Sequence, residues 1–313
     1  MAKLSIIIPV YFNEMNLHDL YDDLKSKVLC KLDAYELVFV DDGSQDSSYT
    51  ILKEIQAMDP NVMLVKLSRN FGSHSAILAG LIHSTGDCAA MKAADLQEPS
   101  TMILEMYEKW LAGNNVVLAI RKDRQEPWVQ KTISNLYYKV MRKIALSSMP
   151  DGGFDCFLID RKVIKVLELM DEKNSTLMGQ ILWAGFKTDV IYYTRLQREK
   201  GKSRWTLSKK IKLFVDSILA FSYFPIRFIS TMGILTFFGT ILWLLYILYA
   251  KMFIGIEVEG WTTLMITNLF FYGLILLTLG IIGEYLWRAF DAARHRPSYI
   301  VEEWIEPKGA KHE

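Results

Sequence analysis

The stretch Met91-Lys92-Ala93-Ala94-Asp95-Leu96-Gln97-Glu98-Pro99 ends a short apolar run that begins at Cys88. A single carboxylate, an amide and a proline follow that run. This pattern predicts a strand that stops where its last side chains can reach a ligand, which is the edge at which open α/β sheets bind their ligands. A helix cap in front of Pro99 explains Asp95 equally well from this stretch alone.

Apolar runs on both sides of this stretch alternate with segments of helical spacing. Four further strands are expected at 4–10, 36–40, 62–67 and 116–120. Helices are expected at 16–28, 46–58 and 75–84, where apolar residues recur every three or four positions. Strands separated by helices of about 10 to 15 residues predict an α/β domain with a mostly parallel sheet.

Acidic residues stand where the expected strands end, and no Gly-x-Gly-x-x-Gly turn follows the first strand. Such carboxylates can accept hydrogen bonds from a base and a ribose, and can hold a divalent ion that neutralises a diphosphate. A turn followed by a helix cap is the alternative for 41–46, but it does not explain two adjacent acids. The acids concerned are Glu14, Asp41, Asp42 and Asp95.

The hydrophobic residues, 51% of the 313, are unevenly placed. The segments 228–250 and 260–283 contain no charged residue. At about 1.5 Å per residue each reaches about 35 Å, enough to cross a hydrocarbon layer of about 30 Å. Core helices are seldom apolar on every face over such a length, so two membrane-spanning helices are expected. The net charge of +1 gives no indication of a nucleic-acid partner.

Charged residues beside the two spans predict their orientation. Basic residues precede the first span and follow the second, whereas the connecting loop holds one lysine and two glutamates. Because cytoplasmic flanks carry the excess of Lys and Arg, both termini are expected in the cytoplasm. The residues are Lys209, Lys210, Lys212 and Arg227 before the first span, Lys251, Glu257 and Glu259 in the loop, and Arg288, Arg294 and Arg296 after the second.

The N-terminal part reads as a cytoplasmic domain. The apolar run from Leu4 to Val10 is too short for the core of a signal peptide. The three cysteines, Cys30, Cys88 and Cys156, lie far apart and lack the spacing of a metal site, so reduced thiols are expected.

Four parts of the chain are therefore expected. They are a globular domain at 1–205, an amphipathic segment at 206–227, two membrane helices within 228–288 and a cytoplasmic tail at 289–313. The segment from Thr206 to Phe221 has the pattern of a basic helix on an anionic membrane surface. A helical stripe at 128–146 fits either a membrane surface or the domain core. The tail from Ser298 to Trp304 has strand character that would suit pairing with a neighbouring subunit in a homo-oligomer.

Four motifs together resemble those of a known family. They are Pro9-Val10-Tyr11-Phe12-Asn13-Glu14, Val40-Asp41-Asp42-Gly43-Ser44, Ser68-Arg69-Asn70-Phe71-Gly72 and Ala94-Asp95-Leu96-Gln97-Glu98-Pro99. With the two C-terminal spans they resemble the family 2 glycosyltransferases, and more narrowly the polyprenyl-phosphate glycosyltransferases of the dolichol-phosphate mannose synthase type. The resemblance covers nearly the whole chain. It implies the fold of the nucleotide-diphospho-sugar transferases (GT-A) and a multi-pass enzyme of the cytoplasmic membrane.

The resemblance also implies roles for individual residues. A divalent cation, Mg²⁺ or Mn²⁺, would lie at Asp95 and Gln97. The family usually has a second acid where this chain has Ala93, and the neighbouring Lys92 is expected to make this stretch still less negative. The nucleotide sugar would be bound by Pro9, Tyr11, Asn13, Glu14, Asp41, Asp42, Arg69 and Ser203.

Basic residues and one further acid complete the expected site. Arg121, Arg124 and Lys131 follow the fifth strand and suit the anionic acceptor and leaving group of a phosphate-linked reaction, although a solvated loop explains them equally. The segment 198–205 resembles the family's loop over the donor phosphates, with an arginine where lysine is usual. By resemblance, the catalytic residues would be Asp155, Arg121, Lys131 and Arg204.

The activity implied is transfer of one sugar, from a UDP-hexose or UDP-N-acetylhexosamine, to polyprenyl (undecaprenyl) phosphate with inversion. Two other classes stay open. A processive polysaccharide synthase shares the fold, but Gly201-Lys202-Ser203-Arg204-Trp205 only superficially resembles its Gln-x-x-Arg-Trp signature, and two spans are few for a polymer channel. A non-catalytic membrane scaffold would account for Ala93, but the retained acids count against it.

Overall fold

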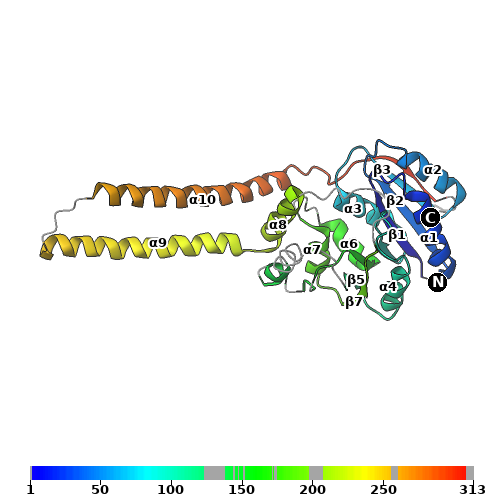
Figure 1. Cartoon of the computed structure of the whole chain (residues 1–313), viewed down its shortest axis with the longest axis horizontal. Coiled ribbons are helices and arrows are strands. Elements are labelled where there is room, and N and C mark those ends of the chain that lie inside the picture. Colours follow the sequence, from blue (N-terminus) through cyan, green and yellow to red (C-terminus); the bar gives the residue numbers. More distant parts are fainter. Residues whose placement is uncertain are drawn as a thin grey trace. The chain divides into compact units, whose positions relative to one another are not determined.

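The computed structural model describes residues 2–122, 138–143, 145–146, 148–150, 152–170, 172, 175–196, 207–254 and 260–307. The chain forms two compact units, 1–217 together with 297–313, and 218–296. Figure 1 shows the elements of both, and each unit is described here by itself.

The first unit is built on one sheet of eight strands in the order β7-β5-β6-β4-β1-β2-β3-β8. Neighbouring strands are parallel except where β6 meets β4 and β5, and where β8 meets β3. The predicted α/β fold with a mostly parallel sheet is therefore confirmed. The strands are β1 (Leu4–Val10), β2 (Tyr35–Asp41), β3 (Val62–Leu67), β4 (Cys88–Met91), β5 (Val116–Arg121), β6 (Cys156–Asp160), β7 (Thr188–Tyr193) and β8 (Val301–Ile305).

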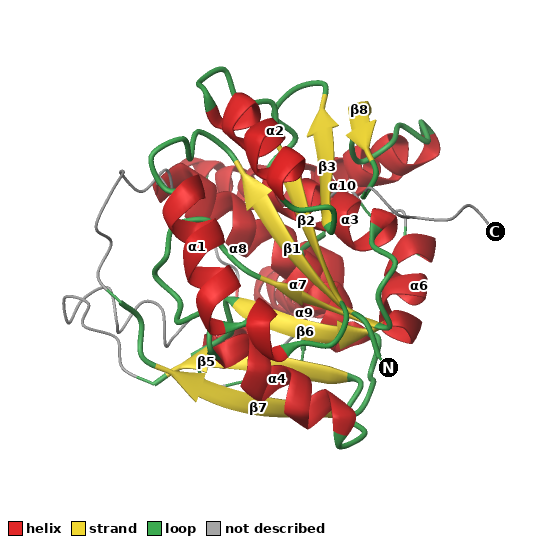
Figure 2. Cartoon of the chain, turned by 90° about the vertical axis from the view of Figure 1, so that its right-hand side faces the viewer, coloured by secondary structure: helices red, strands yellow, loops and turns green. Residues whose placement is uncertain are grey.

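Helices cover both faces of this sheet, so its central strands are buried. Helices α1 and α2 lie together on one face, and α3 and α6 lie together on the other (Figure 2). The continuous apolar run of β1 is almost wholly buried, as expected for a strand covered on both sides. The helices are α1 (Leu17–Lys27), α2 (Ser48–Met58), α3 (Ser73–His83), α4 (Met102–Leu111), α6 (Arg161–Leu169) and α7 (Leu177–Trp183).

The C-terminal tail forms the strand that its sequence predicts, but its partner is different. β8 pairs antiparallel with β3 of its own chain, whereas the sequence-based expectation named a neighbouring subunit as the partner. The ring of Trp304 meets that of His83 edge-on at 5.0 Å, and Lys66 forms an ion pair with Glu302 at 2.9 Å. Without β8, β3 would present a row of unpaired backbone groups at the edge of the sheet. The tail closes that edge.

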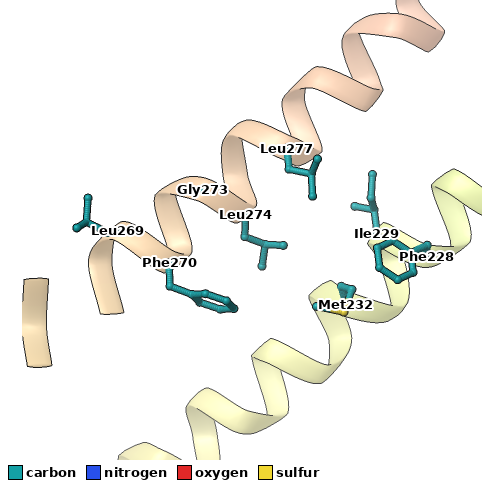
Figure 3. Close-up of a pocket in the computed structure, with 8 residues that line it drawn as sticks. All are labelled: Phe228, Ile229, Met232, Leu269, Phe270, Gly273, Leu274 and Leu277. Atoms are coloured by element: carbon teal, nitrogen blue, oxygen red, sulfur yellow. The ribbon is translucent and has the colours of Figure 1, made fainter. Parts of the chain in front are cut away.

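The second unit consists mainly of two long helices, α9 (Phe224–Tyr249) and α10 (Trp261–Ala293). Both contain segments long and apolar enough to cross a membrane, and within the described residues the most apolar window of each is not buried. A cavity of about 400 Å³ opens between them, lined only by apolar residues (Figure 3). The helix predicted at 206–221 is present as α8 (Leu207–Phe221); the side chains of its lysines lie outside the described part of the structure.

Gly43 is required where the chain leaves β2, and this can be tested. Its φ is +71°, and an added Cβ would lie 2.6 Å from the carbonyl carbon of Arg69. Gly113 also has a positive φ, +90°, but nothing lies within 4 Å of an added Cβ. We expect Gly43→Ala to lower the free energy of unfolding by about 3 kcal/mol, and Gly113→Ala by about 1–2 kcal/mol. Thermal melts of both variants measure the difference. Equal losses would show that the contact with Arg69 yields easily.

Candidate active site

The polar residues singled out in the sequence gather at one edge of the sheet. Strands β1, β2, β4, β5 and β7 all end at this edge, and β6 begins there because it runs antiparallel to its neighbours. Side chains that follow β2 and β4 therefore lie along the same edge as those that end β5 and precede β6. The residues at these positions are Asp42, Asp95, Arg121 and Asp155.

Asp42 holds the loop that carries the motif at 68–72. Its carboxylate accepts hydrogen bonds from the backbone N–H groups of Phe71 and Gly72 at 2.7 and 3.0 Å, and from the amide of Asn70 at 3.0 Å. Only 3% of Asp42 is exposed, and this burial raises its pKa to about 6, although the two backbone donors oppose the shift. Arg69 lies on the same loop, exposed, with its guanidinium over the ring of Phe71.

Asp41 and the segment after β1 form a second set of backbone contacts. Asp41 is fully buried and accepts from the N–H of Ser44 at 3.3 Å; burial raises its pKa, and the bonds from Ser44 oppose this. The hydroxyl of Ser44 accepts from the N–H of Phe12, a residue with φ of +55°. The motifs after β1 and β2 are thus joined into one surface.

The remaining residues of the first motif are only partly buried. The side chain of Asn13 accepts from the N–H of Tyr11 at 2.9 Å, and exposed Glu14 accepts from the N–H of Ser47 at 2.9 Å. Pro9 lies within β1 and is half-buried. Tyr11 therefore stands at the rim of the edge, with its backbone fixed by its own loop.

A buried ion pair closes the loop after β4. Lys92 is fully buried, and its Nζ donates to the carbonyl oxygen of Glu98 at 2.6 Å and lies 3.7 Å from Oε2 of the same residue. Oε2 also accepts from the N–H of Ala93 at 3.2 Å. Burial raises the pKa of Glu98, and the charge of Lys92 opposes that shift. The expectation that Lys92 makes this stretch less negative is therefore wrong, because Glu98 balances its charge inside the core.

Asp95 and Gln97 lie on this loop, between the two residues of the ion pair in the sequence. Asp95 is half-buried, and its Oδ1 accepts from the N–H of Gln97 at 3.2 Å across Leu96, whose φ is +57°. The amide oxygen of Gln97, by contrast, accepts a hydrogen bond from the guanidinium of Arg195. In this arrangement the oxygen expected to face a metal faces a cation of the protein.

Three neighbouring strands supply a second, half-buried cluster. Nε of Arg121, at the end of β5, forms an ion pair with Oδ2 of Asp155, and the hydroxyl of Tyr193 donates to the same oxygen at 3.0 Å. Burial alone would lower the pKa of Arg121, but the charges of Asp155 and Tyr193 outweigh it and raise that pKa. Burial and then Asp155 raise the pKa of Tyr193. The carboxylate of Asp155 thus lies between a guanidinium and a hydroxyl donor.

A divalent cation could be held here only with help from a ligand. Within the described ranges, no three His, Cys, Asp or Glu side chains group as a metal site. Asp95 is the one carboxylate of the metal motif, since residue 93 is alanine. Mg²⁺ is commonly bound through one or two carboxylates together with substrate phosphates, so the residues fit a metal that a diphosphate helps to bind.

The positions of some predicted residues are not part of the described structure. Lys131, Ser203 and Arg204 lie outside the described residues, as does Arg124. Conversely, Tyr193 and Arg195 belong to the edge although neither was among the predicted site residues. Tyr193 is the last residue of β7 and Arg195 lies two residues beyond it, so predicting this strand from the sequence would have pointed to both.

Comparison with known proteins gives a consistent result. Residues 5–168 match glycosyl transferase family 2. An uncharacterized glycosyltransferase of Bacillus subtilis, YkcC, is 39% identical over 96% of this chain and 93% of its own. A bactoprenol glucosyl transferase of Shigella phage SfV is 32% identical over 96% of this chain and 98% of its own.

Solved structures are more distant. A mannosyltransferase from Pyrobaculum calidifontis, in complex with GDP-Man and Mn²⁺, is 17% identical with a TM-score of 0.48, over 67% of this chain and 60% of that chain. A likeness at this level is no argument for a shared activity.

The buried carboxylate of Asp42 should make stability depend on pH. Its folded pKa, about 6, exceeds the ordinary value of 3.8, so the folded state binds this proton more tightly than the unfolded state. The resulting stabilisation is complete below pH 4 and disappears as the pH rises through 6. Between pH 8 and pH 5 the wild type should gain about 1 kcal/mol relative to Asp42→Asn, which cannot titrate. Melting temperatures of the two proteins across this range check the difference; parallel curves would show that Asp42 titrates normally.

Proposed function

The chain belongs to glycosyl transferase family 2, and we propose that it transfers a single sugar from a nucleotide-diphosphate donor to a polyprenyl phosphate. The observation that carries the proposal is the meeting of Asp95 with the Arg121–Asp155–Tyr193 cluster at one sheet edge, in a chain that also has two long apolar helices. The bactoprenol glucosyl transferase relatives support a lipid phosphate as acceptor.

The donor would be a UDP-hexose or a UDP-N-acetylhexosamine. The joined loops after β1, β2 and β3 would bind its nucleotide, since they offer Tyr11 and Arg69 beside fixed backbone groups. Asp42 and Asp41 would act mainly through these loops, because both carboxylates are buried and already accept hydrogen bonds from the backbone. Asn13, Glu14 and Ser203 remain further candidates for this part of the site.

The reaction would be a single in-line displacement with inversion. An oxygen of the acceptor phosphate forms a bond to the anomeric carbon, and the bond from that carbon to the donor diphosphate breaks. The acceptor phosphate is already ionised near neutral pH, so no strong base is required. Asp155 is paired with Arg121 and would therefore serve to orient a reacting group.

Charge stabilisation would supply most of the catalysis. Arg121 is fixed by Asp155 and lies at the edge where phosphate groups would meet, so it can stabilise negative charge without reorganising. Lys131 and Arg204 are proposed to assist it. A divalent cation, Mg²⁺ or Mn²⁺, would neutralise the departing diphosphate when bound, with Asp95 as its carboxylate ligand.

The membrane arrangement is also a proposal. Helices α9 and α10 would span the cytoplasmic membrane as a multi-pass anchor, and α8 would lie at its surface. The catalytic domain at 1–205 and the tail at 289–313 would both face the cytoplasm, with the interfacial segment at 206–227 and the spans within 228–288.

Incubation of membranes or purified protein with labelled nucleotide sugars and polyprenyl phosphate tests the proposed function. We expect one sugar per lipid phosphate and release of the nucleoside diphosphate. A long polymer would instead indicate a processive synthase. Absence of both transfer and donor hydrolysis with every sugar of the panel would favour a membrane scaffold.

The metal dependence of sugar transfer should change with the number of carboxylates on the loop after β4. With Asp95 as the one protein carboxylate, the free enzyme should bind metal poorly, and the metal should join as a complex with the donor. Asp95→Asn should abolish nearly all transfer while leaving the melting temperature within about 1 °C, because a half-buried loop carboxylate contributes little to stability.

A second variant gives the matched control for that experiment. Ala93→Asp should lower the metal concentration needed for half-maximal rate, since Lys92 is already paired with Glu98 and does not compete for the new acid. Metal titrations of the transfer rate compare wild type and both variants. Normal activity and normal metal dependence of Asp95→Asn would remove this loop from the site.

Topology follows from the charges beside the spans. Tags at either terminus should be protected in sealed, right-side-out cells, and a tag within 255–260 should be accessible, because the basic flanks stay in the cytoplasm. Protease protection of the tags measures on which side of the membrane each one lies. Accessible termini would place the domain on the wrong side for a cytoplasmic donor.

A further inference from the structure

The chain crosses the sheet edge just after β7. β7 lies at one end of the sheet, with β5 and β6 between it and β4, yet Leu196 reaches the loop after β4. The N–H of Leu196 donates to the carbonyl oxygen of Gln97 at 2.8 Å, and Nε2 of Gln97 lies 3.5 Å from the carbonyl oxygen of Leu196. These contacts hold Arg195 next to the loop that carries Asp95.

The guanidinium of Arg195 is only partly satisfied. One of its terminal nitrogens donates to the amide oxygen of Gln97. Its Nε is buried and has no acceptor in the described part of the chain. Arginine is rarely buried without a carboxylate or phosphate partner, and a buried donor without an acceptor is costly. Arg121, by comparison, is neutralised by Asp155 at the same edge.

The known chemistry of guanidinium groups indicates which kind of ligand would satisfy Arg195. The planar fork of arginine binds phosphate oxygens through two parallel hydrogen bonds, and a neutral amide on one side leaves its positive charge uncompensated. Gln97 fixes the group without neutralising it. An oxyanion would satisfy both the charge and the remaining donors.

We propose that Arg195 binds a phosphate group of a substrate, and that Gln97 is the residue that positions it rather than a metal ligand. This rests on the proposed function for the identity of the phosphate, which is either the diphosphate of the nucleotide sugar or the phosphate of the lipid acceptor. It is also consistent with Ala93: with one acid fewer than the family usually has, and with the guanidinium of Arg195 held by a neutral amide, the edge should attract phosphate more than free metal.

Direct binding experiments test this without transfer. The probes are UDP and inorganic pyrophosphate, measured by calorimetry on the full chain in detergent, for wild type, Arg195→Met and Arg195→Lys. Lys187→Met is the matched control, since it removes an exposed cation just before β7, at the opposite edge of the sheet. Arg195→Met should weaken binding of the diphosphate probes at least about tenfold, Arg195→Lys less, and Lys187→Met not measurably.

The two sources of phosphate are separated by the Michaelis constants for the two substrates. A raised KM for the nucleotide sugar, with weaker binding of UDP, assigns Arg195 to the donor diphosphate. A raised KM for polyprenyl phosphate with unchanged UDP binding assigns it to the acceptor. Unchanged values of all these constants in both Arg195 variants would overturn the proposal, provided that their melting temperatures show folded protein. Arg195→Lys serves if Arg195→Met does not fold.

Gln97→Glu distinguishes a positioning residue from a metal ligand, because the two roles predict opposite results. If Gln97 positions Arg195, the new carboxylate forms an ion pair with the guanidinium, competes with phosphate and raises the KM or the dissociation constant of the probe severalfold. If Gln97 binds the metal, the same change lowers the metal concentration needed for half-maximal rate. The second result would overturn this role for Gln97.

The inference and the proposed function can fail separately. A wild type that binds pyrophosphate through Arg195 but transfers no sugar would contradict the function and leave the phosphate site standing. A wild type that transfers sugar, but whose dissociation and Michaelis constants do not change when Arg195 is replaced, would support the function and contradict the phosphate site.

Discussion

The buried ion pair between Lys92 and Glu98 fixes the loop on which the rest of the site depends. β4 lies between β6 and β1, so the loop after it emerges near the middle of the carboxyl edge. Lys92 binds the far end of this loop, and Glu98 returns a hydrogen bond to Ala93 at its start. Opening the loop would leave two buried charges unpaired, and removing one partner of such a pair typically costs about 3–5 kcal/mol. The position of Asp95 is therefore set by the core, before any ligand binds.

The direction of β6 is the second constraint. Because β6 runs antiparallel to β4 and β5, the residue that precedes it lies at the edge where its neighbours end. A parallel β6 would carry Asp155 to the opposite edge, far from Arg121. Tyr193, at the end of β7, completes the cluster across β5. Three adjacent strands are needed to make one oriented carboxylate, so the site depends on strand order as much as on residue type.

The local sequence pattern was sufficient to predict the helices and strands. It was not sufficient to predict which segments and side chains contact one another. Apolar runs and helical spacing predicted the α/β fold because they report burial of single segments. The strand at 301–305 was predicted for the same reason, but its pairing with β3 depends on which edge stays open. Lys92 was misjudged because its partner follows a turn with a positive φ at Leu96, which sequence does not reveal. Gln97 can face a metal or a guanidinium with the same side chain, and only the path of residues 194–196 decides.

Ala93 and Arg195 act in the same electrostatic direction. An alanine in place of an acid removes an attraction for cations, and a guanidinium held by a neutral amide adds an attraction for anions. The positive charge of Arg195 next to the loop that carries Asp95 opposes the binding of a free divalent ion. A diphosphate changes this balance, because its own oxygens both satisfy the guanidinium and supply most of the metal's ligands. The anion is then the group that assembles the site. A motif that has lost one acid is consequently compatible with an otherwise complete cluster, since the charge that the protein no longer supplies is carried in by the substrate.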